Sequence, residues 1–362
     1  MSGSNMRPSR RSWTVRTRYV SDATSRGSGE APVRDRLSED DIIARYFAPL
    51  ATAPGAHGLE DDVAVLAPSA DELVLKTDAI VAGVHFFADD PADDVARKAI
   101  RVNLSDLAAK GAVPRGFLLA LGLPAHWSES WLADFSRGLG EDAARYGCPL
   151  LGGDTVRSPE RVFASVTVFG AVPVNRTPRR GGARPGDALY VSGTIGDAAL
   201  GLRLRQDGDA AARWGLGPAE RDHLVRRFRL PEPRFALALA LRRHATAAMD
   251  VSDGLAGDLA KLLRASQATG AVEVRRVPLS PAARRALDRE PGLIEDVLAG
   301  GDDYEVLCAV GPEAGAAFER DAMDAGVGVA RIGRVMAGKG PPLFELPGGE
   351  PLRLERFSFS HF

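Results

Sequence analysis

Aspartates recur along this chain inside short segments rich in glycine or serine, and such carboxylates are able to hold metal ions. The segments are GLEDDVAVL (Asp61, Asp62), KTDAIVAGVHF (Asp78), VNLSDLAAKGA (Asp106), GGDTVR (Asp154), MDVSDGLAGDL (Asp250, Asp253) and GGDDYEVL (Asp302, Asp303). Aspartate is rarely buried, and carboxylates packed together without a counter-charge are strongly destabilising. If the segments converge, a cation must lie among them, and Mg2+ prefers oxygen ligands that it shares with phosphates. The pattern therefore predicts a Mg2+-dependent enzyme that acts on a polyphosphate.

Each segment taken alone also has an ordinary structural interpretation. Asp106 fits a solvated helix face, Asp154 fits a β-turn, and Asp253 fits the N-cap of a helix. His85 stands among aromatic residues, as a packed structural histidine would. Only the joint occurrence of the segments favours a site.

Phosphate-binding motifs of the common kinds are absent from the sequence. Neither a Walker A segment nor a kinase-type glycine-rich loop occurs, and the spacing around Asp250 and Asp253 excludes an EF-hand. Metal ions and backbone amides in glycine-rich turns are the remaining means of holding phosphates.

Composition places the chain among ordinary globular proteins. With 362 residues, 45% hydrophobic and 26% charged, it is long enough for two domains. A net charge of -2 gives no electrostatic case for nucleic acid, and no apolar stretch suggests a membrane span. Two cysteines, Cys148 and Cys308, provide no disulfide framework, so we expect a cytoplasmic protein.

Three parts are expected along the chain. Residues 1–37 form a basic extension, with eight arginines and three acidic residues before Leu37, and this composition predicts disorder. A segment rich in Pro, Gly and Arg at 173–185 separates a domain over 38–174 from a second domain over 175–362.

Hydrophobic periodicity and turn residues predict the elements that must position the aspartates. In the first domain we expect helices over 91–110 and 127–146 and strands over 63–66, 72–75 and 162–172. GGDT (152–155) is expected at a strand end or tight turn. In the second domain we expect helices over 197–205, 220–227, 234–244 and 256–266, and strands over 188–191, 271–274, 304–310 and 329–335. This mixture indicates a two-domain α/β or α+β fold.

Taken in order, these segments resemble the thiamine-monophosphate kinase family of the AIR-synthetase-like ATP-binding superfamily. The resemblance covers about 40–362 and is carried by TDAIVAGVHF, KAIRVNLSDLAAKGA, GGDTVR, RPGDALYVSGTIGDAALGL, MDVSDGLAGDL, GGDDYEVL and the final SHF. It implies an AIR-synthetase-like subunit with a C-terminal α/β domain. It also implies that the N-terminal domain forms a β-barrel with its partner in a homodimer. The implied reaction uses ATP and several Mg2+ ions to convert thiamine monophosphate into thiamine diphosphate.

The resemblance also implies roles for individual residues. The implied Mg2+ ligands are Asp62, Thr77, Asp78, Asp106, Asp154, Asp250 and Asp253, of which Asp78, Asp106 and Asp253 are the catalytic set. The implied ATP contacts are Gly153, Asp154, Arg180 and Ser252. The implied contacts to the thiamine substrate are His85, Asp302 and Phe359.

Three positions depart from the family pattern. Glu60 precedes Asp61 and Asp62 where the family usually has glycine, and Asp302 stands where the family has glutamate. Lys76 replaces a serine or threonine that often precedes the Thr-Asp pair. It removes a hydroxyl metal ligand and adds positive charge beside the cluster.

Related enzymes of the superfamily remain alternatives. Selenophosphate synthetase would require a reactive residue in an N-terminal glycine-rich loop, and no cysteine precedes Cys148. A hydrogenase-maturation dehydratase would require a C-terminal cysteine, whereas this chain ends in Phe362. Aminoimidazole ribonucleotide synthetase is the closest enzymatic alternative, and a non-catalytic regulator that binds nucleotide or thiamine phosphate is the alternative from another class.

Overall fold

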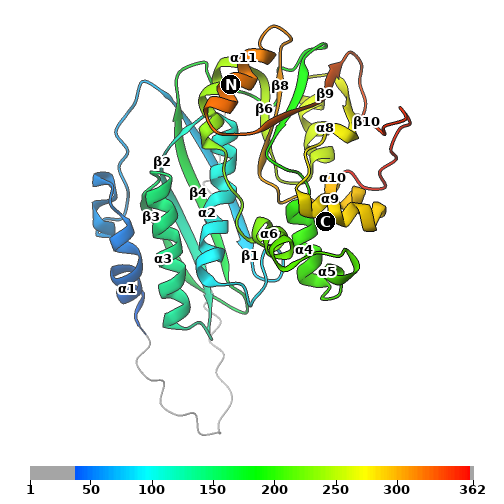
Figure 1. The fold of residues 1–362 in the computed structure, drawn as a ribbon. Coiled ribbons are helices and arrows are strands. Elements are labelled where there is room, and N and C mark those ends of the chain that lie inside the picture. The colour runs from blue at the N-terminus through cyan, green and yellow to red at the C-terminus, as the bar shows by residue number, and fades with distance from the viewer. Residues whose placement is uncertain (1–36, 359–362) are drawn as a thin grey trace, which may run out of the picture. The chain divides into compact units, whose positions relative to one another are not determined.

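Two mixed β-sheets organise this chain into an α/β fold of two domains. The computed structural model describes residues 37–358, and the described residues from Glu39 onward belong to one compact unit (Figure 1). Nearly all of the predicted basic extension lies outside the described residues. Helix α1 (Glu39–Ile42) and the short turns that end at Leu59 precede the first sheet.

The first sheet has four strands in the order β1-β4-β2-β3. Their bounds are β1 (Glu72–Val81), β2 (Val113–Pro124), β3 (Leu150–Ser158) and β4 (Phe163–Val172). Only β2 and β3 pair in parallel, and the other neighbours are antiparallel. Helices α2 (Ala92–Ala109) and α3 (Glu129–Arg145) lie along this sheet (Figure 1). In this strand order β1 and β3 are the two edge strands. Residues carried by β1 therefore lie at the opposite edge of the sheet from residues carried by β3.

The second sheet has six strands in the order β10-β7-β9-β5-β8-β6. The strands are β5 (Ala188–Ser192), β6 (Ala245–Val251), β7 (Thr269–Glu273), β8 (Glu305–Val310), β9 (Val329–Met336) and β10 (Leu343–Glu345). The accompanying helices are α4 (Asp197–Gln206), α5 (Ala210–Arg213), α6 (Pro218–Arg229), α7 (Ala238–His244), α8 (Leu255–Ala265), α9 (Pro281–Arg289), α10 (Ile294–Ala299) and α11 (Gly315–Asp324).

Both faces of this second sheet are buried. Alternate side chains of a strand point to opposite faces, so Leu189 and Val191 of β5 enter one apolar core while Ala188 and Tyr190 enter another. Helix α8 contributes to the first core, and α7 and α11 contribute to the second. Ala109 at the end of α2 also belongs to the second core, so α2 packs against both halves of the chain.

Most of the expected elements are confirmed, with small shifts at their ends. The strand expected over 63–66 is wrong, because this segment is irregular and Val63 and Val65 are 62% and 57% exposed. GGDT is not a strand end or turn but the interior of edge strand β3. Strands β2 and β6 were not expected from the sequence. From Gly116 onward in β2, and over most of β6, the strands are nearly continuously buried, which removes the polar alternation that marks a half-exposed strand.

A buried ion pair joins the two helices of the first domain and contacts the second. Arg101 of α2 donates from Nε and Nη2 to the carboxylate of Asp142 of α3, at 2.5 and 2.9 Å, and from Nη1 to the carbonyl of Pro231 at 3.1 Å. Both charged side chains are less than a tenth exposed. Water therefore hardly reaches either charge, and each depends on the other for compensation.

We expect Asp142→Ala to lower the free energy of unfolding by about 3–5 kcal/mol, because it leaves the Arg101 charge buried without its main partner. Chemical denaturation followed by circular dichroism measures this loss. Arg101→Met combined with Asp142→Ala should lose less than the sum of the two single variants. Additive losses would contradict a direct interaction.

Candidate active site

A cavity of about 430 Å3 brings together side chains from both domains. Strand β1, helix α2, the loop between β6 and α8, and the loop before β8 all contribute to its wall. The predicted site residues that line it are Asp78, His85, Asp106, Arg180, Asp250, Ser252, Asp253 and Asp302. Segments that lie more than two hundred residues apart in the sequence thus converge here, although the segments that carry Asp62 and Asp154 do not.

Lys76 lies between two of the predicted carboxylates. Its Nζ is 3.1 Å from Oδ2 of Asp78 on the same strand and 2.9 Å from Oδ2 of Asp106 on α2. Burial lowers the pKa of Lys76, but attraction to Asp106 and then Asp78 outweighs this, so the pKa lies above its usual value. Burial raises the pKa of Asp78, and Lys76 partly offsets that rise. The ammonium therefore supplies the positive charge that these two carboxylates require.

Asp250, at the end of β6, has one carboxylate oxygen without a partner. The residue is only 4% exposed, and Oδ2 makes no hydrogen bond within the described part of the chain. Burial raises the pKa of Asp250 well above its usual range, and the nearby Asp106 raises it further. A buried polar atom without a partner is costly, and a divalent cation would satisfy it. The donor set of this cavity therefore fits an oxygen-preferring ion such as Mg2+.

Lys261 and Asp258 of α8 order the loop that carries Asp253. Oδ2 of Asp258 accepts the backbone N–H groups of Ser252 and Asp253 at 2.9 Å each, which holds the loop against the helix. Nζ of Lys261 contacts both Asp253 and Asp258. Gly254, not Asp253, is the N-cap of α8. Asp258 and Lys261 were not among the predicted site residues; their three-residue spacing on one helix was the available signal.

Lys98 connects the two predicted substrate contacts. Its Nζ lies 2.9 Å from Oδ2 of Asp302 and donates to the carbonyl of His85, also at 2.9 Å. The side chain is 2% exposed, and the ammonium lies 3.9 Å from the centre of the Phe228 ring. Lys98 was not among the predicted site residues, because its partner Asp302 is 204 residues away in the sequence.

The loop before β8 holds Asp302 in an unusual backbone conformation. Asp302 and Tyr304 have φ angles of 64° and 51°, which non-glycine residues rarely adopt. The loop is anchored on both sides: Asp302 N donates to the carbonyl of Ser252 at 2.8 Å, and buried Asp303 accepts the N–H of Gly196 at 2.8 Å. Such strain persists only where the surroundings impose it, and it often accompanies functional sites.

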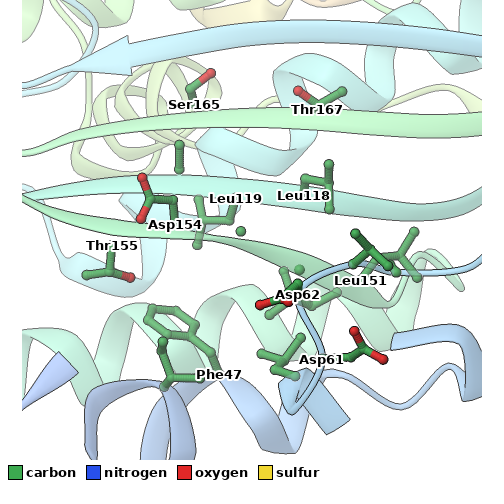
Figure 2. A pocket seen from close by; sticks show the side chains of 18 of the residues that line it. Phe47, Asp61, Asp62, Leu118, Leu119, Leu151, Asp154, Thr155, Ser165 and Thr167 are labelled. Atoms are coloured by element: carbon green, nitrogen blue, oxygen red, sulfur yellow. The ribbon is translucent and has the colours of Figure 1, made fainter. Parts of the chain in front are cut away.

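Three other predicted metal and ATP residues of the first domain line a second cavity of about 810 Å3. Asp62, Gly153 and Asp154 contribute to its wall, together with Asp61 and Thr155. Figure 2 shows Asp154 and Thr155 from β3, with Asp61, Asp62 and Phe47 on one side and Ser165 and Thr167 on the other. Asp154 lies on β3, the edge of the sheet opposite to β1, and Asp62 lies in the irregular segment before β1; neither lines the first cavity with Asp78.

Gly153 is required by the close approach of β2. A Cβ placed on this residue would lie 2.0 Å from the carbonyl oxygen of Leu119, so no larger side chain fits. The glycine of GGDT therefore serves strand packing in this structure, whatever else it contacts.

Two predicted residues lie in neither cluster. Thr77 lies on strand β1, where its Oγ1 donates to the carbonyl of Val166 at 3.2 Å and accepts from Thr167 Oγ1 at 3.0 Å. It does not line the first cavity. Phe359 lies outside the described residues.

A basic groove of about 740 Å3 adjoins the first cavity and shares Lys76, Asp106 and Arg180 with it. Lys110 and Arg179 add two further basic side chains. Burial lowers the pKa of Lys110 to about 8, although Asp250 and Asp106 partly offset the effect. Positive charge next to a carboxylate cluster suits a ligand with several phosphates.

Protein side chains alone do not complete a metal site in the described part of the chain. Within residues 37–358, no three His, Cys, Asp or Glu side chains are close enough together to hold a metal ion by themselves. Any ion would therefore also need substrate oxygens or water among its ligands. No helix in the same part of the chain is long and apolar enough to cross a membrane.

Comparison with known proteins identifies relatives of both domains. Residues 60–172 match the AIR synthase related protein N-terminal domain, and residues 184–344 match the corresponding C-terminal domain. The thiamine-monophosphate kinase of Caulobacter vibrioides is 44% identical over 92% of this chain and 94% of its own length. The crystal structure of the thiamine-monophosphate kinase from Stenotrophomonas maltophilia has 37% identity and a TM-score of 0.75, covering 86% of this chain and 96% of that one. The structure of AaThiL complexed with AMPPCP and TMP has 31% identity and a TM-score of 0.69, covering 83% and 91%.

We expect Lys98→Met to lower the free energy of unfolding by about 1–3 kcal/mol, because it leaves the carbonyl of His85 and the carboxylate of Asp302 without their donor. Methionine retains the contact with the Phe228 ring, which isolates the effect of the charge. Urea denaturation measures the loss. Combined with Asp302→Asn, the loss should fall short of the sum of the single losses, and a strictly additive result would show that the pair is not coupled.

Proposed function

Since the chain belongs to the thiamine-monophosphate kinase family and is an enzyme of that class, we propose that it transfers the γ-phosphoryl group of ATP to the phosphate of thiamine monophosphate. The products are thiamine diphosphate and ADP. The observation that carries the proposal is the first cavity, where five predicted aspartates from four segments line the wall and Oδ2 of the buried Asp250 has no partner among the described residues.

The acceptor needs no catalytic base. A phosphate monoester has a second pKa of about 6 and is mostly dianionic at neutral pH, so it is already a nucleophile. The difficulty is to bring two polyanions together. Mg2+ ions, held by Asp78, Asp106, Asp250 and Asp253, would supply neutralising charge on the phosphate oxygens.

The chain's own residues orient the reactants for in-line transfer. Arg180 and Lys110, in the basic groove, are suited to hold the phosphates of ATP. Asp302 and His85 also line the cavity and are both contacted by Lys98, and the thiamine substrate would bind beside them. The hydrogen bond from Asp302 N to Ser252 O links the loop of a proposed substrate contact to the loop of a proposed ATP contact, and so fixes their relative position. Orientation of this kind accounts for a large share of catalysis in reactions between two bound ligands.

A homodimer is part of the proposal. Leu73 and Leu75 on β1 and Val113 on β2 belong to the four-stranded sheet and are each more than half exposed. Exposed apolar side chains gathered on one sheet are typical of an interface. A partner covering this sheet would give the closed β-barrel that the resemblance implies. The buried free cysteines Cys148 and Cys308 are consistent with the cytoplasm as the proposed location.

The activity itself is tested with purified protein, ATP, thiamine monophosphate and Mg2+. We expect equal amounts of ADP and thiamine diphosphate, and no product when EDTA removes the metal. ADP without thiamine diphosphate would assign the chain another acceptor, and nucleotide binding without any turnover would make it a regulator.

Asp78→Asn and Asp106→Asn should each lower kcat at least about a hundredfold, because a neutral amide cannot balance the charge of a bound cation. The thermal transition should remain cooperative, which separates loss of chemistry from loss of fold. Asp324→Asn at the exposed end of α11 is the matched control and should keep wild-type activity. Near-normal turnover of either site variant would refute the carboxylate cluster as the catalytic centre.

Leu75→Glu should convert the dimer into a monomer, because it buries a charge in the proposed interface. Light scattering coupled to size exclusion gives the mass directly. Leu239→Glu, on α7 and also nearly half exposed, is the control and should leave the mass unchanged. A wild-type protein with the mass of one chain would contradict the dimer.

A further inference from the structure

Lys76 makes a contact that distinguishes it from an ordinary surface lysine. Its ammonium reaches two carboxylates on different elements, Asp78 on β1 and Asp106 on α2, at 3.1 and 2.9 Å. Its side chain is 32% exposed, so the group is partly withdrawn from water. Within residues 37–358, no other basic side chain pairs with either aspartate. The ammonium thus lies where a bridging cation would lie.

The lysine and a divalent ion cannot occupy this position together. Mg2+ requires its oxygen ligands at about 2.0–2.1 Å in octahedral geometry. An ion bound to Oδ2 of both aspartates would be within a few ångströms of an ammonium that contacts the same two atoms. Repulsion at that distance is strong in a site that is partly screened from solvent.

We propose that Lys76 is a built-in cation that takes the place of one divalent metal ion between Asp78 and Asp106. The inference rests on the proposed function, because it assumes that the first cavity holds Mg2+. It goes beyond that function, because it assigns part of the charge compensation to a side chain of this chain. The remaining ions would be held by Asp250 and Asp253, where Oδ2 of Asp250 has no partner, and by the carboxylate oxygens of Asp78 and Asp106 that Lys76 does not contact.

The neighbouring Lys261 shows why this role belongs to Lys76 alone. Lys261 also contacts two carboxylates, those of Asp253 and Asp258. However, Asp258 also accepts hydrogen bonds from the backbone N–H groups of Ser252 and Asp253. The contact between Lys261 and Asp258 therefore helps to order the loop that carries Asp253. Asp78 and Asp106 belong to a strand and a helix that are fixed by other packing. Lys76 therefore compensates the negative charge of Asp78 and Asp106 and is not needed to position them.

Ion counting tests the proposal without reference to catalysis. Mn2+ serves as the probe for Mg2+, and free Mn2+ is measured by electron paramagnetic resonance, with and without AMPPCP. The variants are Lys76→Thr, which removes the charge and adds a hydroxyl, and Lys76→Met, which removes the charge without adding a ligand. Lys76→Arg retains the charge. Lys339→Met, at an exposed position outside the cavity, controls for the change in net charge.

We expect Lys76→Thr and Lys76→Met each to bind one more Mn2+ per chain than the wild type, or to bind the weakest ion at least tenfold more tightly. The arginine variant and Lys339→Met should match the wild type. Equal numbers and affinities for the wild type, the threonine variant and the methionine variant would overturn the proposal. If one of these two variants does not fold, as judged by circular dichroism, the other decides.

Failure of this inference is distinguishable from failure of the proposed function. Thiamine diphosphate formation by the wild type, with unchanged ion counts in the Lys76 variants, would overturn only the role of Lys76. An extra ion in the variants of a protein that forms no thiamine diphosphate would support the role of Lys76 and refute the proposed reaction.

Discussion

Repulsion among carboxylates that are drawn into one cavity is the constraint on which the rest of this structure depends. Asp78, Asp106, Asp250 and Asp253 come together from three segments, and each carboxylate destabilises the fold unless a positive charge compensates it. Lys76 compensates two of them and Lys261 a third. Among these four aspartates, Asp250 alone has a buried carboxylate oxygen without a hydrogen-bond partner in the described chain. The positions of the basic side chains thus indicate where the protein balances its own charge and where an external cation fits.

Long-range contacts hold the two halves of the cavity together. Helix α2 carries Asp106 and Lys98 on its surface, contributes Ala109 to the core of the second domain, and binds the carbonyl of Pro231 through Arg101. Because α2 packs in both domains, it fixes the position of one domain relative to the other. The strained loop around Asp302 is then held against it by Lys98 and by the backbone of Ser252. Such cross-domain anchoring lets two sets of ligands meet with little freedom.

The distribution of the predicted ligands over two cavities follows from strand order. Asp78 is on one edge strand and Asp154 is on the other, with two strands between them. Both cavities contain acidic and glycine-rich segments, so composition alone does not distinguish them. GGDT has the residues of a turn, yet it forms a continuous strand because β2 provides a parallel partner. Gly153 has no side chain, so the carbonyl of Leu119 on β2 can approach it closely.

The sequence by itself determined the fold class, most helices and the family resemblance, because local periodicity and ordered motifs depend on neighbouring residues. It identified Asp78, Asp106, Asp250, Asp253 and Asp302 as candidate site residues on the condition that their segments converge, and the tertiary structure meets that condition. It could not show that strands β2 and β6 exist, since strands buried on both faces lack alternation. It also could not assign partners to Lys76, Lys98 and Lys261 or separate Asp62 and Asp154 from the first cavity. Those outcomes are decided by which elements become neighbours in space, and only the tertiary structure determines this.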